Sequence, residues 1–340
     1  MSDNGHPVLK AEEEQRTATF KRNTLLEDML RTLNGNFAPV EQKLLAEPEA
    51  LGPDYPVVFT LGALRSGSTL FTQWLAASGL FAYPTNMLSR FYGAPVVGAQ
   101  IQLLLTDPRY NFRNEIFDFN APLSFSSENG KTRGALAPNE FWYFWRRFLP
   151  FHGELDYLPD EELMRVADTR GLVNELTALT RVFGKPFVLK SMILNYNVAF
   201  LDRLFEKALF IETVRDPVAN VASALDARRR QFGTEDEWYS FKIPEYHELK
   251  SLSPVEQVAG QVSYVNRAIA AGFERVAEKR KLVVNYEAFC ADPKAVFEQI
   301  VDRLDCWPVR PVYTGEASFS QTRPDIPRRA EIERVLARFS

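Results

Sequence analysis

Residues 56–69 read Pro56-Val-Val-Phe-Thr-Leu-Gly62-Ala-Leu-Arg65-Ser66-Gly67-Ser68-Thr69, and this stretch decides the fold that we predict. It opens with a short apolar run, rich in β-branched side chains, which is typical of a buried parallel strand. A turn with two glycines follows, and apolar residues then recur at helical spacing over residues 69–78. The stretch therefore predicts a strand, a glycine-containing turn and a helix in succession.

Three later segments extend this pattern along the chain. Residues 186–190 and 208–214 are predicted strands that flank a helical pattern over 198–205, and residues 281–286 form a further predicted strand after a helical pattern over 255–279. Strand, helix and strand in this order indicate a parallel sheet with right-handed crossovers. The expected fold class is α/β, with three α/β/α layers around a central parallel sheet.

The chain has 340 residues, of which 46% are hydrophobic and 25% are charged, and this composition excludes disordered and fibrous classes. A chain of this size fits one large α/β domain with appendages. We expect the main domain over residues 51–340, with an insertion at about 85–180. Residues 1–50 are expected to form an N-terminal helical appendage with two short amphipathic helices, because Asn34, Gly35, Asn36 and Pro39 interrupt the segment.

Net charge, cysteine and histidine spacing, and hydrophobic runs limit the partners, metal sites and membrane segments that we expect. A formal net charge of −4 does not suggest affinity for a nucleic-acid backbone, so we expect no nucleic-acid partner. Cys290, Cys306 and the histidines His6, His152 and His247 show no metal-ligand spacing, so no metal site is expected. No apolar run approaches the roughly 18 residues of a membrane span, and the polar start has no signal-peptide core, which predicts a cytoplasmic protein without a transmembrane segment.

Residues 62–69, which we call the first turn, have the composition of a phosphate cradle. Backbone N–H groups line such a turn, and the helix N-terminus adds partial positive charge. The nucleotide-triphosphatase version of this loop needs a lysine where this chain has Ser68, whereas here the cation is Arg65. A shifted cation fits a ligand with a single 5′-phosphate and one transferable group better than it fits ATP with magnesium. The alternative is a glycine turn that binds no ligand.

A second candidate anion site follows the strand over residues 208–214. Asp216 is a good helix N-cap and Pro217 a good first helical residue, so Arg215 lies at the mouth of a strand-to-helix turn, with Ser223 on the following helix. We call residues 214–217 the second turn. Parallel strands place both turns at one edge of the sheet, which describes a nucleotide crevice. Alternatively, Arg215 pairs with a carboxylate and Ser223 faces solvent.

Together the two turns resemble the sulfotransferases that use 3′-phosphoadenosine 5′-phosphosulfate (PAPS). The resemblance includes Tyr286-Glu287 and Asp292-Pro293, and it extends over roughly residues 55–305, with the middle hundred residues only weakly matched. It implies the P-loop nucleotide-hydrolase-like fold of these enzymes. It also implies that the first turn binds the 5′-phosphosulfate and the second turn the 3′-phosphate. The residues concerned are Arg65, Ser66, Gly67, Ser68 and Thr69 for the first site, and Arg215 and Ser223 for the second.

The resemblance further implies an activity. A sulfuryl group would move from PAPS to a hydroxyl or amine of a small natural product, a glycan or a lipid, with release of 3′,5′-bisphosphoadenosine (PAP) and without an obligatory metal. Residues 85–180 would bind this acceptor. Lys190 resembles the family lysine that contacts the bridging or sulfonyl oxygens, although it could also be a strand-end lysine in solvent. Arg323 belongs to a late basic segment that could close over the 3′-phosphate.

The chain departs from the family pattern at the position of the general base. Cytosolic members of the family carry a histidine two residues after the lysine, where this chain has Met192. Glu140 is the first candidate for the base, because it starts an aromatic helix whose apolar walls are expected to raise its pKa toward neutrality. His152 is the second candidate, since histidine titrates in the right range. Glu140 could instead be a helix-start carboxylate, and His152 a plain loop residue.

Two other functions fit the sequence less well. A P-loop kinase is disfavoured by the absence of lysine at position 68 and of a carboxylate-ended strand for magnesium. A nucleotide-binding module without catalysis would carry the same two turns. The run Arg228-Arg229-Arg230 is interpreted as a solvated helix end rather than as a site. The sequence leaves the oligomeric state open.

Overall fold

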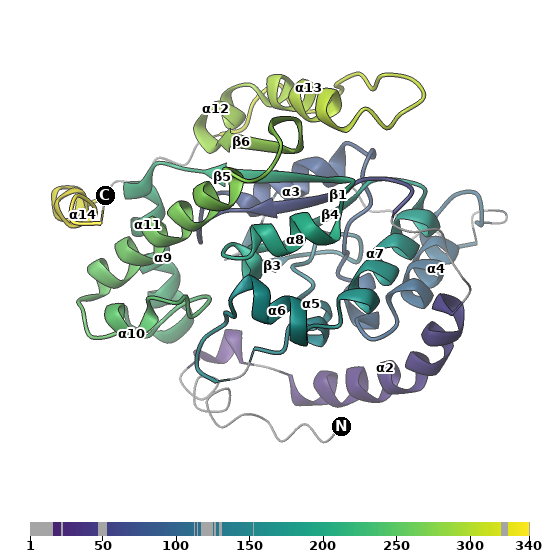
Figure 1. The fold of residues 1–340 in the computed structure, drawn as a ribbon, viewed down its shortest axis with the longest axis horizontal. Coiled ribbons are helices and arrows are strands. Elements are labelled where there is room, and N and C mark those ends of the chain that lie inside the picture. The colour runs from purple at the N-terminus through teal and green to yellow at the C-terminus, as the bar shows by residue number, and fades with distance from the viewer. Residues whose placement is uncertain are drawn as a thin grey trace.

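The structure of the chain is a computed structural model (Figure 1). It describes residues 16–21, 23–46, 53–111, 113, 115–116, 125, 127–128, 131–151, 153–320 and 326–339.

Among the described residues, the central sheet has four parallel strands in the order β4-β1-β5-β6. Strand β1 (Val57–Leu61) pairs on one side with β4 (Phe187–Lys190) and on the other with β5 (Ala208–Val214), which in turn pairs with β6 (Lys281–Asn285). All four strands were predicted from the sequence within one residue at each end. The burial of both faces of β1 and β5 explains their continuous apolar runs.

Helices cover both faces of the sheet, so the predicted three-layer α/β/α fold is confirmed (Figure 1). On one face lie α3 (Ser68–Ala77), α12 (Tyr286–Ala291) and α13 (Pro293–Leu304). There Phe71 and Trp74 of α3 pack against Phe289 of α12. The other face packs against α5 (Trp142–Phe148), α7 (Thr169–Phe183), α8 (Val198–Leu204), α9 (Pro217–Phe232) and α11 (Pro254–Phe273).

The remaining described elements surround these layers. They are the α-helices α2 (Thr24–Leu45), α4 (Pro95–Thr106), α6 (Asp160–Val166), α10 (Tyr246–Leu249) and α14 (Arg329–Leu336), the short 3-10 helices Ala18–Phe20, Leu88–Phe91, Met192–Leu194 and Glu278–Arg280, and the antiparallel pair β2 (Ser127–Glu128) and β3 (Lys131–Thr132). No helix of the described residues is long and apolar enough to cross a membrane.

The N-terminal segment differs from the prediction of two short helices. A single helix, α2, runs through Pro39, because tertiary contacts hold the polar residues that suggested a break. The buried Asn34 side chain donates to the carbonyls of Leu30 and Arg90, and it accepts from the N–H of Gly93. Glu41 accepts from two N–H groups at the start of α4. Helix α2 is therefore fastened to the body along its length.

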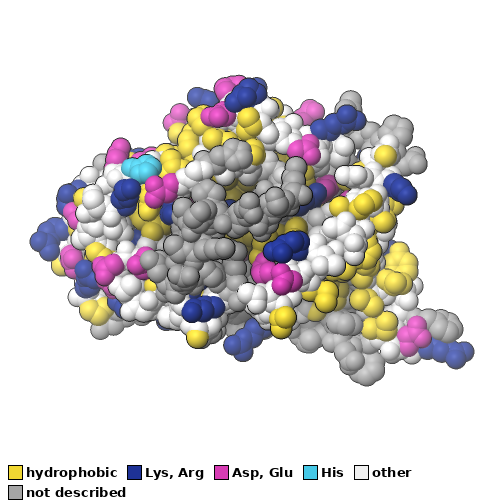
Figure 2. Space-filling view, turned by 90° about the horizontal axis from the view of Figure 1, so that it is seen from below, with side chains coloured by type: hydrophobic (Ala, Val, Ile, Leu, Met, Phe, Trp, Pro, Cys, Tyr) yellow, Lys and Arg dark blue, Asp and Glu magenta, His cyan; other side chains and the backbone are white. Residues whose placement is uncertain are grey.

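Helix α2 also contributes apolar side chains to the surface. Leu25, Met29, Val40 and Leu44 are exposed on it. Figure 2 views the molecule from the side on which α2 lies in Figure 1, and hydrophobic side chains reach the surface there among charged ones.

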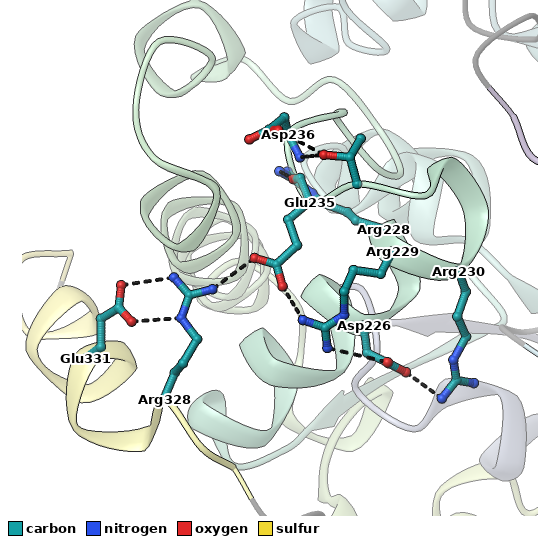
Figure 3. A network of polar contacts seen from close by, with 9 residues as sticks. Asp226, Arg228, Arg229, Arg230, Glu235, Asp236, Arg328 and Glu331 are labelled. Carbon is teal, nitrogen blue, oxygen red and sulfur yellow. Dashed lines mark hydrogen bonds and ion pairs between the residues drawn. The ribbon is translucent and has the colours of Figure 1, made fainter.

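The arginine run at the end of α9 is not simply solvated. Arg228 is fully buried and donates to the carbonyl of Glu235 and the side chain of Gln257. Arg229 and Arg230 are exposed, as expected, and both pair with Asp226. Arg229 and Arg328 also pair with the Glu235 side chain, so the network ties α9 to the segment before α14 (Figure 3). The expectation of a solvated end was thus wrong for Arg228, because the next loop folds back over it.

Glu212 of β5 is a buried carboxylate at the centre of the sheet, and it gives the fold a testable pH dependence. It lies on the same face as Leu61 and Phe210, and burial raises its pKa to about 7. A carboxyl whose pKa is higher in the folded than in the unfolded chain stabilises the fold at low pH. Its stabilising effect is present below about 4.5 and is lost as the pH rises through about 7.

We therefore expect Glu212→Gln to remove part of the pH dependence of stability. Between pH 4.5 and 8, the wild-type free energy of unfolding should fall by roughly 2–3 kcal/mol more than that of the variant, since one pKa unit corresponds to about 1.4 kcal/mol. Urea denaturation at several pH values measures this difference. Glu206→Gln, at an exposed position shortly before the same strand, is the matched control and should follow the wild type. Parallel curves for the wild type and Glu212→Gln would contradict the assignment.

Candidate active site

The first turn needs both of its glycines. Gly62 and Gly67 have φ angles of +146° and +92°, which other residues rarely adopt. A Cβ atom on Gly62 would lie 2.7 Å from the carbonyl oxygen of Thr213, and one on Gly67 would lie 2.1 Å from the ring of Tyr286. Arg65, at the tip, also has a positive φ of 60°. The backbone is therefore bent tightly between β1 and α3.

The hydroxyl residues of the first turn divide into two groups. Ser66 is buried, and its hydroxyl is bonded to that of Thr213 at 2.8 Å, while its N–H donates to the carbonyl of Ala63. Ser66 thus holds the shape of the turn. Ser68 and Thr69 begin α3, where the first N–H groups of a helix lack intrahelical partners. These N–H groups are available to an anion at the helix N-terminus.

The second turn forms as the sequence predicts. The Asp216 side chain caps α9 by accepting from the N–H of Val218 at 2.9 Å, and Pro217 is the first residue of the helix. Arg215 directly precedes the cap, and Ser223 lies on α9 itself. The carboxyl ends of β1 and β5 are neighbours in the sheet, so the two turns lie side by side.

Hydrogen bonds join the two turns. Arg65 Nε donates to Ser223 Oγ at 3.1 Å, and Arg215 Nη1 donates to the carbonyl of Arg65 at 3.3 Å. Arg215 Nε is buried and has no hydrogen-bond partner among the described residues. A buried donor without a partner requires an explanation, such as an anion that belongs at the site. The residues expected to bind two phosphates are therefore brought together, and Arg215 Nε is still unsatisfied.

Lys190 and Glu140 form an ion pair beside the first turn. Lys190 Nζ lies 2.5 Å from Glu140 Oε1 and donates to Thr69 Oγ1 at 3.2 Å. The other carboxylate oxygen, Glu140 Oε2, accepts from the indole N–H of Trp142 at 2.7 Å. The Lys190 side chain is only 5% exposed, whereas that of Glu140 is 34% exposed. Lys190 is thus not a solvated strand-end lysine, whereas the Glu140 side chain is partly accessible to solvent.

The electrostatics of Glu140 differ from the expectation of a neutral pKa. Burial raises its pKa, as the apolar surroundings suggested, but the charge and hydrogen bond of Lys190 and the bond from Trp142 outweigh burial and hold the pKa below its usual range. Helix α5 begins at Trp142, so Glu140 precedes the helix instead of starting it. Without a bound ligand, Glu140 is therefore an ionised carboxylate paired with a cation.

Met192 lies beside the first turn. Its sulfur lies 3.6 Å from the Ser68 hydroxyl, so the side chain borders the first turn. A mainly apolar cavity extends from it, lined by Tyr157, Tyr196, Phe241 and Ile243 among others. The Phe241 ring also contacts that of Trp142, with centroids 4.8 Å apart. The side chains that line the cavity thus contact Ser68 through Met192, and Glu140 through Phe241 and Trp142.

Tyr239 is a candidate functional residue that the sequence did not indicate. It lies between α9 and α10, and its carbonyl accepts from the Gln261 side chain at 3.2 Å. Burial raises the pKa of its hydroxyl, and the charges of Arg65 and Glu140 act on it as well. Residues 238–241 read Trp-Tyr-Ser-Phe, and this aromatic cluster in a loop was the available signal.

Two predicted site residues lie outside the described residues. They are His152, the second candidate base, and Arg323, expected near the 3′-phosphate. Among the residues that are described, no group of three or more His, Cys, Asp or Glu side chains is arranged to hold a metal ion.

Sequence comparison assigns the class of protein. Residues 56–308 match the sulfotransferase family, and this range is well over half of the chain. The chain therefore belongs to the sulfotransferase family. Membership supports a transferase that moves sulfuryl groups, in agreement with a crevice of cations beside a carboxylate. A search of curated proteins finds no significant match.

The fold is similar to that of a solved sulfotransferase. The chain is similar to the sulfotransferase STF9 from Mycobacterium avium, with a TM-score of 0.51 and 18% identity, covering 98% of this chain and 79% of that one. STF1 from Mycobacterium tuberculosis H37Rv has a TM-score of 0.46 and 12% identity, covering 92% of this chain and 76% of that one. The sulfotransferase domain of the Synechococcus PCC 7002 olefin synthase has a TM-score of 0.37 and 21% identity, covering 76% of each chain.

Proposed function

We propose that this protein is a sulfotransferase that uses PAPS as donor and releases PAP. The observation that carries the proposal is the contact between the two turns. Arg65 of the first turn bonds Ser223 next to the second, and Arg215 of the second bonds the backbone of the first. A nucleotide with phosphate groups at both its 5′ and 3′ positions matches two adjacent anion sites at one edge of a parallel sheet.

The roles of the residues follow from their positions. In the proposed complex, the N–H groups at the start of α3, together with Arg65, hold the 5′-phosphosulfate, and Arg215 with Ser223 holds the 3′-phosphate. Lys190 stabilises the charge that develops on the oxygen between phosphorus and sulfur. It already donates to Thr69 of the first turn, and on donor binding it would exchange its bond to Glu140 for one to the donor.

Glu140 is the proposed general base. It takes the proton of the acceptor hydroxyl as the acceptor oxygen bonds to sulfur and the bond from sulfur to the phosphate oxygen breaks. While Lys190 is paired with it, Glu140 is ionised but a weak base. When Lys190 turns to the donor, the carboxylate loses its cation and its pKa rises, so donor binding would activate the base.

The acceptor is proposed to enter from the side of Trp142 and Phe241, within reach of residues 85–180. The cavity beside Met192 presents ring faces and aliphatic side chains. Its volume of about 20 Å³ holds only a water-sized group, so the acceptor class proposed here stays a small natural product, a glycan or a lipid.

Nucleotide binding tests the donor class. We expect PAP to raise the melting temperature without magnesium, while ATP has little effect, because no lysine occupies position 68. Thermal shift measurements with each nucleotide, with and without magnesium, give the answer. A magnesium-dependent shift of equal size with ATP would indicate a kinase. Binding of PAP without sulfate transfer to any acceptor would indicate a module that has lost catalysis.

Arg215→Ala tests the 3′-phosphate site. Charge-assisted hydrogen bonds are worth roughly 1.5–3 kcal/mol, so we expect PAP binding to weaken about tenfold or more. Adenosine 5′-phosphosulfate lacks the 3′-phosphate, and its affinity should scarcely change. Isothermal titration calorimetry measures both. Arg230→Ala, which removes an exposed arginine near the far end of α9, is the control. Equal weakening of both ligands would show that Arg215 is structural.

Glu140→Gln tests the base. We expect kcat to fall by about 10²–10⁴ while the affinity for PAP stays nearly unchanged. While Lys190 is paired with Glu140, kcat/KM for the donor should fall only at pH values below the ordinary glutamate pKa of 4.5. Once Lys190 has turned to the donor, the pKa of Glu140 rises, so kcat should begin to fall at a higher pH.

Both of these decreases in rate at acidic pH should be absent from the Glu140→Gln variant. A limb near neutral pH that survives in Glu140→Gln and disappears in His152→Asn would assign the base to His152. If neither substitution changes kcat more than a few-fold, neither residue is the base.

A further inference from the structure

The backbone of Phe141, the residue after the proposed base, has a left-handed conformation. Its φ angle is +56° and its ψ angle +37°, and it is the last residue before α5. A bulky side chain rarely adopts these angles, because its Cβ atom comes too close to the backbone. Such strain persists only where surrounding contacts stabilise it. The contacts around Phe141 therefore have to hold it in this conformation.

The conformation of Phe141 decides where Glu140 lies. With helical angles at Phe141, α5 would begin earlier and Glu140 would be part of its first turn, as the sequence suggests. Because Phe141 is left-handed, α5 begins at Trp142 and Glu140 stays outside the helix. Its carboxylate then reaches Lys190 Nζ and the indole N–H of Trp142. The pairing of Glu140 with Lys190 thus depends on the backbone of Phe141.

The Asn139 side chain holds the backbone of Phe141. Its Oδ1 accepts from the N–H of Phe141 at 2.8 Å, which forms a local turn around Glu140. The side chain of Phe141 is held as well, because it is only 1% exposed and its ring stacks on that of Phe144, with centroids 4.5 Å apart. Phe141 is therefore fixed by a polar bond on its backbone and by apolar packing on its ring.

Asn86 fixes Asn139 in turn. Asn139 Nδ2 donates to Asn86 Oδ1 at 2.8 Å, and the N–H of Asn139 donates to the carbonyl of Pro84 at 2.7 Å. Asn86 Nδ2 donates to the carbonyl of Gly134 at 2.9 Å, and to the carbonyl and the hydroxyl of Thr132 at 3.2 Å. Both amide groups use their oxygen and their nitrogen in hydrogen bonds, so their orientations are fixed.

We propose that Asn139 and Asn86 are positioning residues for the general base, which hold Phe141 in its left-handed conformation and so keep the Glu140 carboxylate at Lys190. The inference rests on the proposed function, since it takes Glu140 as the base. Both asparagines belong to residues 85–180, the segment proposed to bind the acceptor. The same segment would then orient the base toward the acceptor that it binds.

The position of Glu140 is measurable without any substrate. Lys190 holds the pKa of Glu140 below its usual range, and loss of a nearby cation raises the pKa of a carboxyl group. In Asn139→Ala we therefore expect this pKa to rise to the ordinary value of 4.5 or above. The other groups that face Glu140, Arg65 and the Tyr239 hydroxyl, are unchanged in the variant.

Carbon NMR of the glutamate carboxyl groups measures the pKa, and the Glu140 signal is the one that is absent from Glu140→Gln. Asn86→Ala should shift the pKa in the same direction as Asn139→Ala. Asn139→Ser, whose hydroxyl can form the same kind of turn more weakly, should give an intermediate value. Asn111→Ala is the matched control, because the Asn111 side chain bonds both the N–H and the carbonyl of Ile116 in another loop.

Turnover connects this position to the base. Hydrolysis of PAPS, in which water attacks sulfur in place of the acceptor hydroxyl, needs no identified acceptor. We expect Asn139→Ala to lower its kcat about tenfold to a hundredfold, while the affinity for PAP changes less than about twofold. In a Glu140→Gln background the same substitution should lower kcat less than about twofold, because Asn139 acts only through Glu140.

Two results would overturn the inference. One is an unchanged Glu140 pKa in both Asn139→Ala and Asn86→Ala. The other is an equal loss of kcat from Asn139→Ala in the wild-type and Glu140→Gln backgrounds, which would make the role of Asn139 merely structural. If the pKa shifts as expected while the wild-type protein neither binds PAP nor releases it from PAPS, the proposed function fails and the positioning of Glu140 does not.

Discussion

Parallel pairing of β1 with β5 brings the turn after each strand to the same edge of the sheet, and the contacts of the crevice depend on this pairing. Each strand ends in a turn that starts a helix and carries one arginine. The first N–H groups of α3 lack intrahelical partners, whereas the start of α9 is capped by Asp216. Two cations would repel each other in isolation. Here Arg65 and Arg215 are kept together by bonds to Ser223 and to the Arg65 backbone, and the arrangement suits a ligand with two negative groups.

The Lys190–Glu140 pair connects this anion crevice to the acceptor side. Lys190 ends β4, which pairs with the opposite edge of β1, and Glu140 comes from the segment before α5. The nearly buried Lys190 holds the pKa of the partly exposed Glu140 carboxylate below its usual range while no donor is bound. In the proposed enzyme, the same pair links donor binding to the strength of the base. No histidine is then needed at Met192.

The predicted elements of the α/β core agree with the structure because their signals are local. Val57–Leu61 and Ala208–Val214 are apolar on both faces, and Asp216-Pro217 is a cap and first-turn combination that any helix would use. The predictions that failed involve long-range contacts. Helix α2 continues past Pro39 because Asn34 and Glu41 bond α4 and its preceding turn, and Arg228 is buried because a later loop covers it.

The sequence by itself determined the four core strands and the helix that follows each of them, the residues of the two turns and the absence of a histidine at position 192. These properties depend on side chains close together in the chain. Only the tertiary structure decided that Lys190 forms an ion pair with Glu140, that Tyr286 packs on Gly67, and that Tyr239 lies where the charges of Arg65 and Glu140 act on it. Those contacts join residues from 50 to more than 200 positions apart. Their geometry depends on how helices pack over the sheet, which no short stretch of sequence encodes.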